Sequence, residues 1–397
     1  MPMNRRHILQ LSGTGVGMAL ATACGVAPAI RVSRALTVWT IQYIIDDGLA
    51  RWRRLHPEIA VTRIPVTADT FVSRLDAARA GGEPVPDVVV APSDLVARFS
   101  QPGVWHALDD QQFPVTQLAP SGVAQCRSED NRLLALPVAV NPLGVWYRSD
   151  ILQHAGLPQQ PETVATQIGT DWQQFLAFGM QIHANMPDVG WCADAMSDVF
   201  TPLTRTQTPL RTAAEFAFAV RSQHADFAAT RNSGAWFDLL QRDRVAMVVA
   251  GSWMQATLGR TTRPGEFPWR VIAPPNGCIA GACLAIAVSE ASNQRDDALR
   301  FMRDMVFDEE TQLIVSDNQQ LIPARTDTYT DGRFQRMEPF CAGQKIGQLW
   351  TYAAKTMTGH ALSARWVQRN QDAHTVVANA LGGSVSYSDA LQQLSDM

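Results

Sequence analysis

The sequence predicts an α/β fold of two lobes, each a sheet flanked by helices, with hinge crossings of the chain between them. Its 397 residues, 46% of them hydrophobic and 18% charged, are enough for two compact domains. Strand patterns alternate with helical patterns, and the strands are almost continuously apolar, which is typical of a sheet covered on both faces. Two long apolar runs interrupted by proline indicate that the chain passes from one sheet to another.

The alternation of strand and helix patterns begins at the start of the mature chain. Apolar residues recur at helical spacing in two segments, one carrying Leu49 and Trp52 and the other carrying Phe71 and Leu75. Proline ends the first segment, and a glycine pair ends the second. The expected strands are residues 35–39, 59–66 and 87–91, and the expected helices are residues 44–55 and 70–80.

Prolines inside two long apolar runs mark where the chain changes sheets. Residues 133–147 include the Asn141-Pro142 bend, and residues 271–289 include a Pro-Pro-Asn-Gly turn. Neither run suits one straight central strand, because proline cannot donate a hydrogen bond to a neighbouring strand. We expect a third crossing near residues 322–325, and helices beyond it. The predicted first lobe is residues 35–140 plus 282–323, and the predicted second lobe is residues 141–281 plus 324–397.

The amino terminus has the features of an export signal. Arg5 and Arg6 precede an apolar stretch that is too short to span a bilayer, and small residues then lead to Cys24. The arginine pair resembles a twin-arginine signal, and the small residues resemble a lipoprotein cleavage box. We therefore expect residues 1–24 to be a lipoprotein-like export signal with Cys24 as the lipidation site. The mature protein is expected in the periplasm or at the extracytoplasmic face of the cell membrane. The alternative is release in soluble form after Ala23 or Ala29.

Composition and motifs exclude several classes of function. The net charge is −4 and the basic residues are scattered, so a nucleic-acid partner is not expected. The chain contains no phosphate-binding loop, nucleophile elbow, zinc-protease motif or dinucleotide fingerprint. No cysteines fall at C-x-x-C spacing and no histidines at H-x-x-x-H spacing, so neither a metal nor a cofactor is expected. Cys278 and Cys283 are close enough in sequence to bridge a small loop; the alternative is that they are buried thiols.

Eight short segments carry a resemblance to a known protein family. They include Pro-Asp-Val-Val-Val-Ala-Pro-Ser-Asp at residues 86–94 and Val-Val-Ala-Gly-Ser-Trp at residues 248–253. The full set is residues 86–94, 136–148, 155–158, 171–175, 245–253, 321–325, 365–366 and 388–391. Because these segments follow in order over nearly all of residues 36–395, the chain resembles the family 1 extracellular solute-binding proteins of bacterial ATP-driven (ABC) importers.

This resemblance implies a periplasmic-binding-protein-like fold of type II, whose two lobes close around a ligand. It implies capture of a carbohydrate, a di- or oligosaccharide, and delivery to the transmembrane permease subunits and their ATPase. Such a protein is expected to be a monomer, to catalyse no reaction, and to meet the membrane only through its lipid anchor. Eleven tryptophans agree with a sugar ligand, because an indole face stacks on the C–H face of a sugar ring.

Candidate binding residues follow the apolar strands, because ligand crevices in α/β sheets lie beyond the carboxyl ends of strands. Tryptophans offer a stacking surface there, and amides, hydroxyls and carboxylates offer hydrogen bonds to sugar hydroxyls. By this rule the candidates are Trp39, Gln42, Ser93, Asp94, Asn141, Ser252 and Trp253, with Trp253 foremost for stacking. Weaker candidates from other segments are Trp191, Arg325 and Trp350.

Each candidate also has a structural interpretation. The tryptophans can be core residues, and Ser93 or Asp94 can cap a helix. Asn141 can be a turn residue before proline, and Arg325 can form a structural ion pair. Three further tryptophans fall in helical patterns that predict packing for them: Trp172, Trp236 and Trp366.

Two other functions stay open on the sequence. A binder of a phosphorylated polyol such as glycerol phosphate needs an arginine or a helix amino terminus at the phosphate, and Arg325 supplies an arginine. An exported glycoside-active enzyme needs two carboxyl groups opposed across the substrate. The adjacent pairs Asp46-Asp47 and Asp109-Asp110 do not provide that arrangement.

Overall fold

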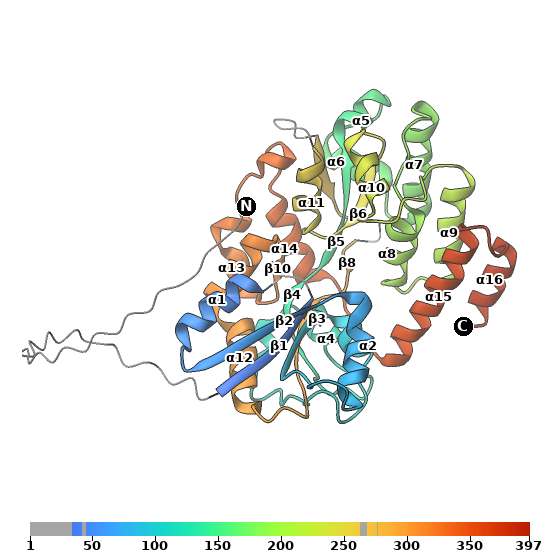
Figure 1. The fold of residues 1–397 in the computed structure, drawn as a ribbon. Coiled ribbons are helices and arrows are strands. Elements are labelled where there is room, and N and C mark those ends of the chain that lie inside the picture. Colours follow the sequence, from blue (N-terminus) through green and yellow to red (C-terminus); the bar gives the residue numbers. More distant parts are fainter. Residues whose placement is uncertain (1–33, 42–44, 263–267, 276) are drawn as a thin grey trace, which may run out of the picture. The chain divides into compact units, whose positions relative to one another are not determined.

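A computed structural model of the chain, shown in Figure 1, describes residues 34–41, 45–262, 268–275 and 277–397. All of these residues belong to one unit of the chain, Val32–Met397. The expected export signal, its Cys24 and the candidate Gln42 lie outside the described residues. Within the described ranges, no helix combines the length and the apolar character that crossing a membrane requires. The fold is α/β, with two sheets flanked by helices, as predicted.

The first sheet has six strands, β1 (Arg34–Ile41), β2 (Ile59–Val66), β3 (Val88–Pro92), β4 (Leu136–Val140), β9 (Leu284–Val288) and β10 (Ile322–Pro323). Their order in the sheet is β10-β4-β9-β3-β1-β2. β1 is parallel to β2 and β3, whereas β9 is antiparallel to both of its neighbours, β3 and β4. The strands β4 and β9 are buried along their whole length, which explains their continuous apolar sequences.

The second sheet has three main strands and a short fourth one, β5 (Pro142–Arg148), β6 (Met247–Ala250), β7 (Trp269–Ile272) and β8 (Ile279–Ala280). β5 lies between β6 and β7 and is antiparallel to both. β8 pairs with the start of β5, opposite Pro142 and Leu143. The amino-terminal end of β5 is therefore the place where the second sheet meets the chain that comes from the first.

The chain changes sheets at the two proline-containing runs, as predicted. Only Asn141 separates β4 of the first sheet from β5 of the second. The second run leads through β7 and β8 of the second sheet to β9 of the first. β10 pairs with β4 at residues 322–323, within the segment where a third crossing is expected. The lobe boundaries at residues 140/141, 281/282 and 323/324 stay predictions.

Helices surround both sheets (Figure 1). The helices before β4 are α1 (Asp46–Leu55), α2 (Ala68–Arg79), α3 (Ser93–Ala97) and α4 (Pro120–Gln125). Those between β5 and β9 are α5 (Ser149–His154), α6 (Pro161–Ile168), α7 (Trp172–Asn185), α8 (Thr201–Thr204), α9 (Leu210–Ser222), α10 (Gly234–Gln241) and α11 (Met254–Thr261). Those after β9 are α12 (Arg295–Phe307), α13 (Glu309–Gln319), α14 (Ile346–Thr356), α15 (Ala364–Leu381) and α16 (Tyr387–Ser395).

Polar side chains fix where several helices begin. Asp171 accepts a hydrogen bond from the backbone N–H of Gln174 at 2.8 Å and starts α7. Ser363 accepts one from the backbone N–H of Trp366 at 3.0 Å and starts α15. The second cap sets the position of Trp366 in the first turn of α15.

Candidate functional site

A cavity of about 500 Å³ lies where the segment after α8, the β8 segment and the segment before α15 meet. We call it the Trp366 cavity. Its lining combines one tryptophan, one arginine, one histidine, small residues and neutral polar groups. The lining residues are Arg205, Thr206, Gln207, Cys278, Ile279, Ala280, Thr358, Gly359, His360 and Trp366.

Backbone contacts hold these three segments together. Ile279 in β8 pairs with Leu143 in β5 and forms a bridge with Thr358, so the wall of the cavity is continuous with the second sheet. Gly359 lies against the backbone of Ser121 in α4, and a Cβ at this position would clash with the Ser121 backbone. Only glycine permits this close approach, which brings the loop before α15 against the helix that packs on β4.

Trp366 contributes the one large aromatic surface of the cavity. Its side chain is half-buried, unlike the buried tryptophans of the cores. The edge of the His360 ring contacts it at a centroid separation of 5.1 Å, and the Arg205 guanidinium lies 5.4 Å from the indole centroid. The indole thus stands beside a cation and a neutral polar lining, an arrangement suited to a ligand with both apolar and hydroxyl faces.

An ion pair joins the Trp366 cavity to the first sheet. Arg205 follows α8, and Asp94 lies in α3, directly after β3. Arg205 Nη1 donates to Asp94 Oδ1 at 2.8 Å, and Arg205 Nη2 donates to Asp94 Oδ2. This two-pronged geometry is the strongest form of an arginine–carboxylate contact. The pair ties α3, which packs on the first sheet, to the segment after α8.

Burial and the Arg205 charge set the ionisation of the surrounding groups. Burial alone lowers the pKa of the Arg205 guanidinium, but the charge and hydrogen bonds of Asp94 outweigh it and raise that pKa. Burial lowers the pKa of His360 and of His374, and repulsion from Arg205 lowers both further, against the opposing effect of Asp94. Both histidines are therefore neutral at neutral pH, and Arg205 is charged.

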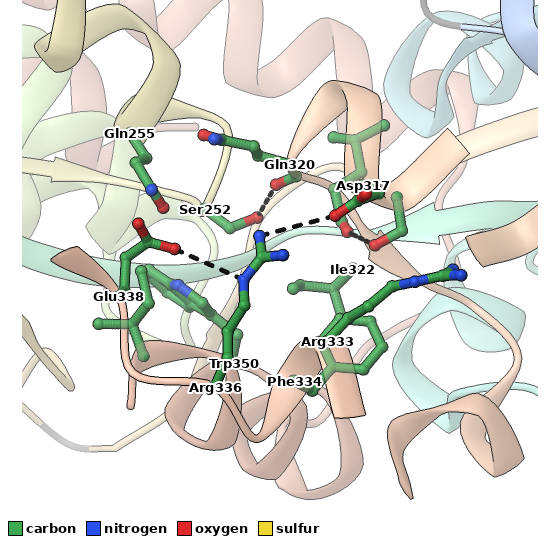
Figure 2. A pocket seen from close by; sticks show the side chains of 14 residues that line it. Ser252, Gln255, Asp317, Gln320, Ile322, Arg333, Phe334, Arg336, Glu338 and Trp350 are labelled. Atoms are coloured by element: carbon green, nitrogen blue, oxygen red, sulfur yellow. Dashed lines mark hydrogen bonds and ion pairs between the residues drawn. The ribbon is translucent and has the colours of Figure 1, made fainter. Parts of the chain in front are cut away.

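A second, much smaller pocket of about 70 Å³ lies between the end of α13, the start of α11 and the start of α14. We call it the Arg336 pocket. Figure 2 shows the Arg336 guanidinium in its centre, between the carboxylates of Asp317 and Glu338. The closest nitrogen–oxygen distances are 3.6 Å to Asp317 and 3.9 Å to Glu338, which are ion pairs without a close hydrogen bond. The protein's own side chains therefore fill most of this pocket.

Three sequence candidates lie in or next to the Arg336 pocket. Ser252 lines it and donates a hydrogen bond to the backbone oxygen of Gln320 at 2.6 Å (Figure 2). Trp350 also lines it, but its side chain is buried and contacts the Trp146 ring at 5.8 Å. Trp253, next to Ser252, is half-buried and packs against the larger hydrophobic core. Their part in ligand binding stays a prediction.

Two sequence candidates lie at or beside the Trp366 cavity. Asp94 reaches it through its bond to Arg205. Asn141 is at the first crossing, and its side chain fits between Gly251 and Gly281, where any Cβ would collide with it. Gly281 follows a residue that lines the cavity, so Asn141 is directly behind that wall. Among the residues that the structure describes, the buried Asn141 Oδ1 has no hydrogen-bond partner, which leaves it able to accept one.

Two tryptophan candidates are core residues in this conformation. Trp39 is 1% exposed, and the Arg74 guanidinium lies over its ring at 4.6 Å. Trp191 is also 1% exposed and meets the edge of Phe175 at a centroid separation of 4.9 Å. Neither indole offers a free face to a ligand here, which agrees with the structural interpretation given by the sequence.

Ser93 and Arg325 likewise have partners within the protein. Ser93 is buried, and its hydroxyl donates to Gln125 Oε1 at 2.9 Å. Arg325 Nε donates to Asp327 Oδ1 at 2.8 Å and Arg325 Nη2 donates to Asp327 Oδ2 at 2.7 Å, so it forms the structural ion pair that was its alternative. Arg205, and not Arg325, is the arginine that lines the Trp366 cavity.

Arg205 and Trp366 are the residues that sequence reasoning missed. The helical pattern correctly placed Trp172 and Trp236 in cores, where both are buried. Trp366 also packs, as predicted, against the small cluster of Ala97, Leu362 and Val367, but it stays half-buried in the first turn of α15 and lines the cavity as well. Its signal was its position three residues after Ser363, a capping residue. No local pattern marked Arg205.

The described cysteines are free thiols. Cys278 and Cys283 do not bridge; Cys283 instead lies 3.9 Å from Cys126, sulfur to sulfur, and both of those thiols are buried. Burial raises the pKa of the Cys126 thiol well above its usual value, and its neighbour Cys283 raises it further. Within the described ranges, no cluster of three or more histidine, cysteine, aspartate or glutamate side chains is placed to hold a metal ion.

Comparisons with known proteins agree with this architecture. A sequence model of the bacterial extracellular solute-binding proteins matches residues 54–340. A crystal structure of an extracellular solute-binding protein of family 1 superposes with a TM-score of 0.78 at 19% identity, over 91% of this chain and 97% of that chain. No curated protein sequence matches significantly.

Two further solved structures carry bound sugars or sugar-like ligands. The GacH receptor of Streptomyces glaucescens, solved unliganded and with acarbose, gives a TM-score of 0.71 at 19% identity, over 92% of this chain and 97% of that chain. A transporter-associated binding protein of B. animalis subsp. lactis, solved with β-1,6-galactobiose, gives 0.72 at 16% identity, over 91% and 96%. These two-lobed structures share the fold seen here.

Proposed function

Because the chain belongs to the bacterial extracellular solute-binding proteins, we propose that it is the extracytoplasmic substrate-binding component of an ABC importer. It captures a carbohydrate, a di- or oligosaccharide, in the Trp366 cavity and delivers it to the membrane permease. It acts as a binding protein without catalysis. The observation that carries this proposal is the cavity itself, which combines one partly open indole with a paired arginine and neutral polar groups.

The dimensions and chemistry of the cavity support a sugar ligand. A volume of about 500 Å³ falls within the range of small-molecule sites. An indole that covers roughly 60 Å² of a sugar ring contributes on the order of 1.5 kcal/mol. Amide and hydroxyl side chains of the lining, such as Gln207 and Thr358, both donate and accept hydrogen bonds, as sugar hydroxyls do. The sugar-bound solved structures of the same fold support the same ligand class.

Closure and membrane delivery belong to the same proposal. Two lobes that are linked by chain crossings rotate around a ligand and expel water from the site. The partners are the transmembrane permease subunits and their ATPase, and the binding protein acts as a monomer. We also propose that Cys24 carries lipid and tethers the protein to the membrane, which the mass of the native mature protein would reveal.

A thermal-shift screen of the mature domain against mono-, di- and oligosaccharides tests the ligand class. A ligand at 100 times its Kd stabilises the folded state by about 2.7 kcal/mol, so a true ligand gives a clear rise in melting temperature. Glycerol phosphate and free phosphate form the control arm, because a binder of phosphorylated polyols would respond to them. Two results would contradict the proposal: a rise in melting temperature with phosphate compounds alone, or no rise with any saccharide.

A further inference from the structure

The contact between Arg205 and Asp94 is more than a surface ion pair. The two side chains are 15% and 24% exposed, and the bond joins α3, which packs on the first sheet, to the segment after α8 at the edge of the Trp366 cavity. Water screens the two charges only weakly at such low exposure, so the charge of each group is compensated mainly by the charge of the other. Any ligand that enters the cavity meets the two charges as one unit.

The charge balance of the cavity is neutral. Among the lining residues that the structure describes, Arg205 is the one permanently charged group, and Asp94 compensates its charge. His360 in the lining and His374 near Arg205 are neutral at neutral pH for the reasons given above. An incoming anion therefore finds no uncompensated positive charge.

The pair still has hydrogen-bonding capacity for a ligand. A guanidinium has five N–H groups, and Asp94 takes two of them. Each carboxylate oxygen of Asp94 can accept a second hydrogen bond. Arg205, unlike Asp94, lines the cavity, so a ligand hydroxyl can accept from its remaining N–H groups without separating the pair. A carboxylate, by contrast, would stand next to the negative charge of Asp94.

We infer that Arg205, held by Asp94, is a specificity-determining residue that selects neutral saccharides and rejects acidic ones. This inference rests on the proposed function, because it concerns the ligand of the same cavity. Arg205 positions hydroxyls of the ligand, while Asp94 cancels the positive charge that would otherwise attract a uronate or a phosphorylated sugar. The variant Asp94→Asn keeps the shape of the side chain and leaves the Arg205 charge uncompensated.

Titration calorimetry with two ligands that differ by one carboxylate tests the inference. The ligands are the neutral saccharide that gives the largest shift in the screen and the same saccharide with its terminal residue oxidised to a uronate. We expect the wild-type protein to prefer the neutral ligand by at least about 10-fold. In Asp94→Asn, the uronate should gain affinity and reduce this ratio by about 10-fold or more, because it now pairs with Arg205. In Arg205→Met, the neutral ligand should bind more weakly and the uronate should not gain.

Arg51→Met is the matched control. Arg51 makes a similar two-pronged contact with Asp308, at 25% and 32% exposure, but lines neither cavity. Its removal should leave the ratio of the two affinities unchanged. An unchanged ratio in a well-folded Asp94→Asn protein overturns the inference while leaving the proposed function intact. Wild-type protein that binds neither saccharide overturns the proposed function and the inference with it. If Arg205→Met fails to fold, the isosteric Asp94→Asn decides the question alone.

Discussion

The Trp366 cavity and the Arg336 pocket differ in how their charged groups are held. In the cavity, Arg205 forms two short hydrogen bonds to a single carboxylate and leaves about 500 Å³ open. In the pocket, Arg336 is 56% exposed, lies at 3.6 Å or more from two carboxylates, and leaves about 70 Å³ (Figure 2). Both regions contain a tryptophan, but Trp366 is half-buried and Trp350 is buried.

The two arginines differ in placement: two hydrogen bonds to Asp94 hold Arg205 at the edge of an open cavity, whereas Arg336 has no close hydrogen bond to either carboxylate and lies in the centre of its smaller pocket. The tryptophans follow the same division: a buried indole supports the fold, whereas a half-buried one can meet a ligand. Substitutions in the two regions should therefore affect different measurements.

The largest effect is expected from Trp350→Ala. The Trp350 ring contacts Trp146 and packs so closely on Gly144 that no Cβ would fit there. Removing a buried tryptophan should lower the free energy of unfolding by about 3–5 kcal/mol. Denaturant unfolding measures this loss, and saccharide affinity of the remaining folded protein should be nearly unchanged. Normal stability combined with lost binding would show that Trp350 is a ligand contact after all.

Trp366→Ala should have the opposite profile. Loss of one stacking surface should weaken saccharide binding by about 1.5–3 kcal/mol, roughly 10- to 150-fold. Stability should change much less, because the side chain is only half-buried. Calorimetry on Trp366→Ala and Trp253→Ala, side by side, compares the residue that the structure favours with the residue that the sequence favoured. A larger affinity loss in Trp253→Ala would reverse that preference.

The smallest of the three effects concerns pH. His374 meets the edge of Phe200 at 5.0 Å, and its pKa is lowered by burial and by Arg205 from an ordinary value of 6.5. Below about pH 6.5 the unfolded chain therefore binds more protons at this residue than the folded protein, so stability falls as the pH falls. Denaturant unfolding measures the free energy of unfolding at each pH. In His374→Gln, its decline between pH 6.5 and 5 should be shallower than in the wild-type protein, while above pH 7.5 it should change with pH equally in both proteins. Identical decline in both proteins would exclude His374 as a source.

The sheets were predictable because their signals are local. Prolines in otherwise apolar runs indicate that the chain leaves a sheet, and the chain does change sheets at Asn141. Alternating apolar segments placed β2 at its observed bounds, Ile59–Val66. In α1, the helix before β2, Leu49 and Trp52 are buried as their helical spacing predicts, whereas the last residue, Leu55, is 53% exposed.

The candidate site was much harder to predict, because its parts are distant in sequence. Asp94 was a candidate, but its partner Arg205 is 111 residues away and lies in a polar segment without a motif. The rule that ligands lie beyond strand ends selected Trp39, yet Arg74 from α2 covers that indole. The contacts of Asp94 with Arg205 and of Trp39 with Arg74 depend on how helices pack over the sheet. Neither residue type nor sequence spacing predicts that packing.

The place of β9 in the first sheet has a consequence for how the chain acquires its structure during synthesis. β9 stands between β3 and β4, so these two strands have no direct pairing with each other. The centre of the first sheet is therefore missing until residues 284–288 have left the ribosome, after the strands of the second sheet are already made. Pairing over such long sequence separations is slow. The first sheet, whose first strands are synthesised early, is thus among the last parts of the fold to be completed.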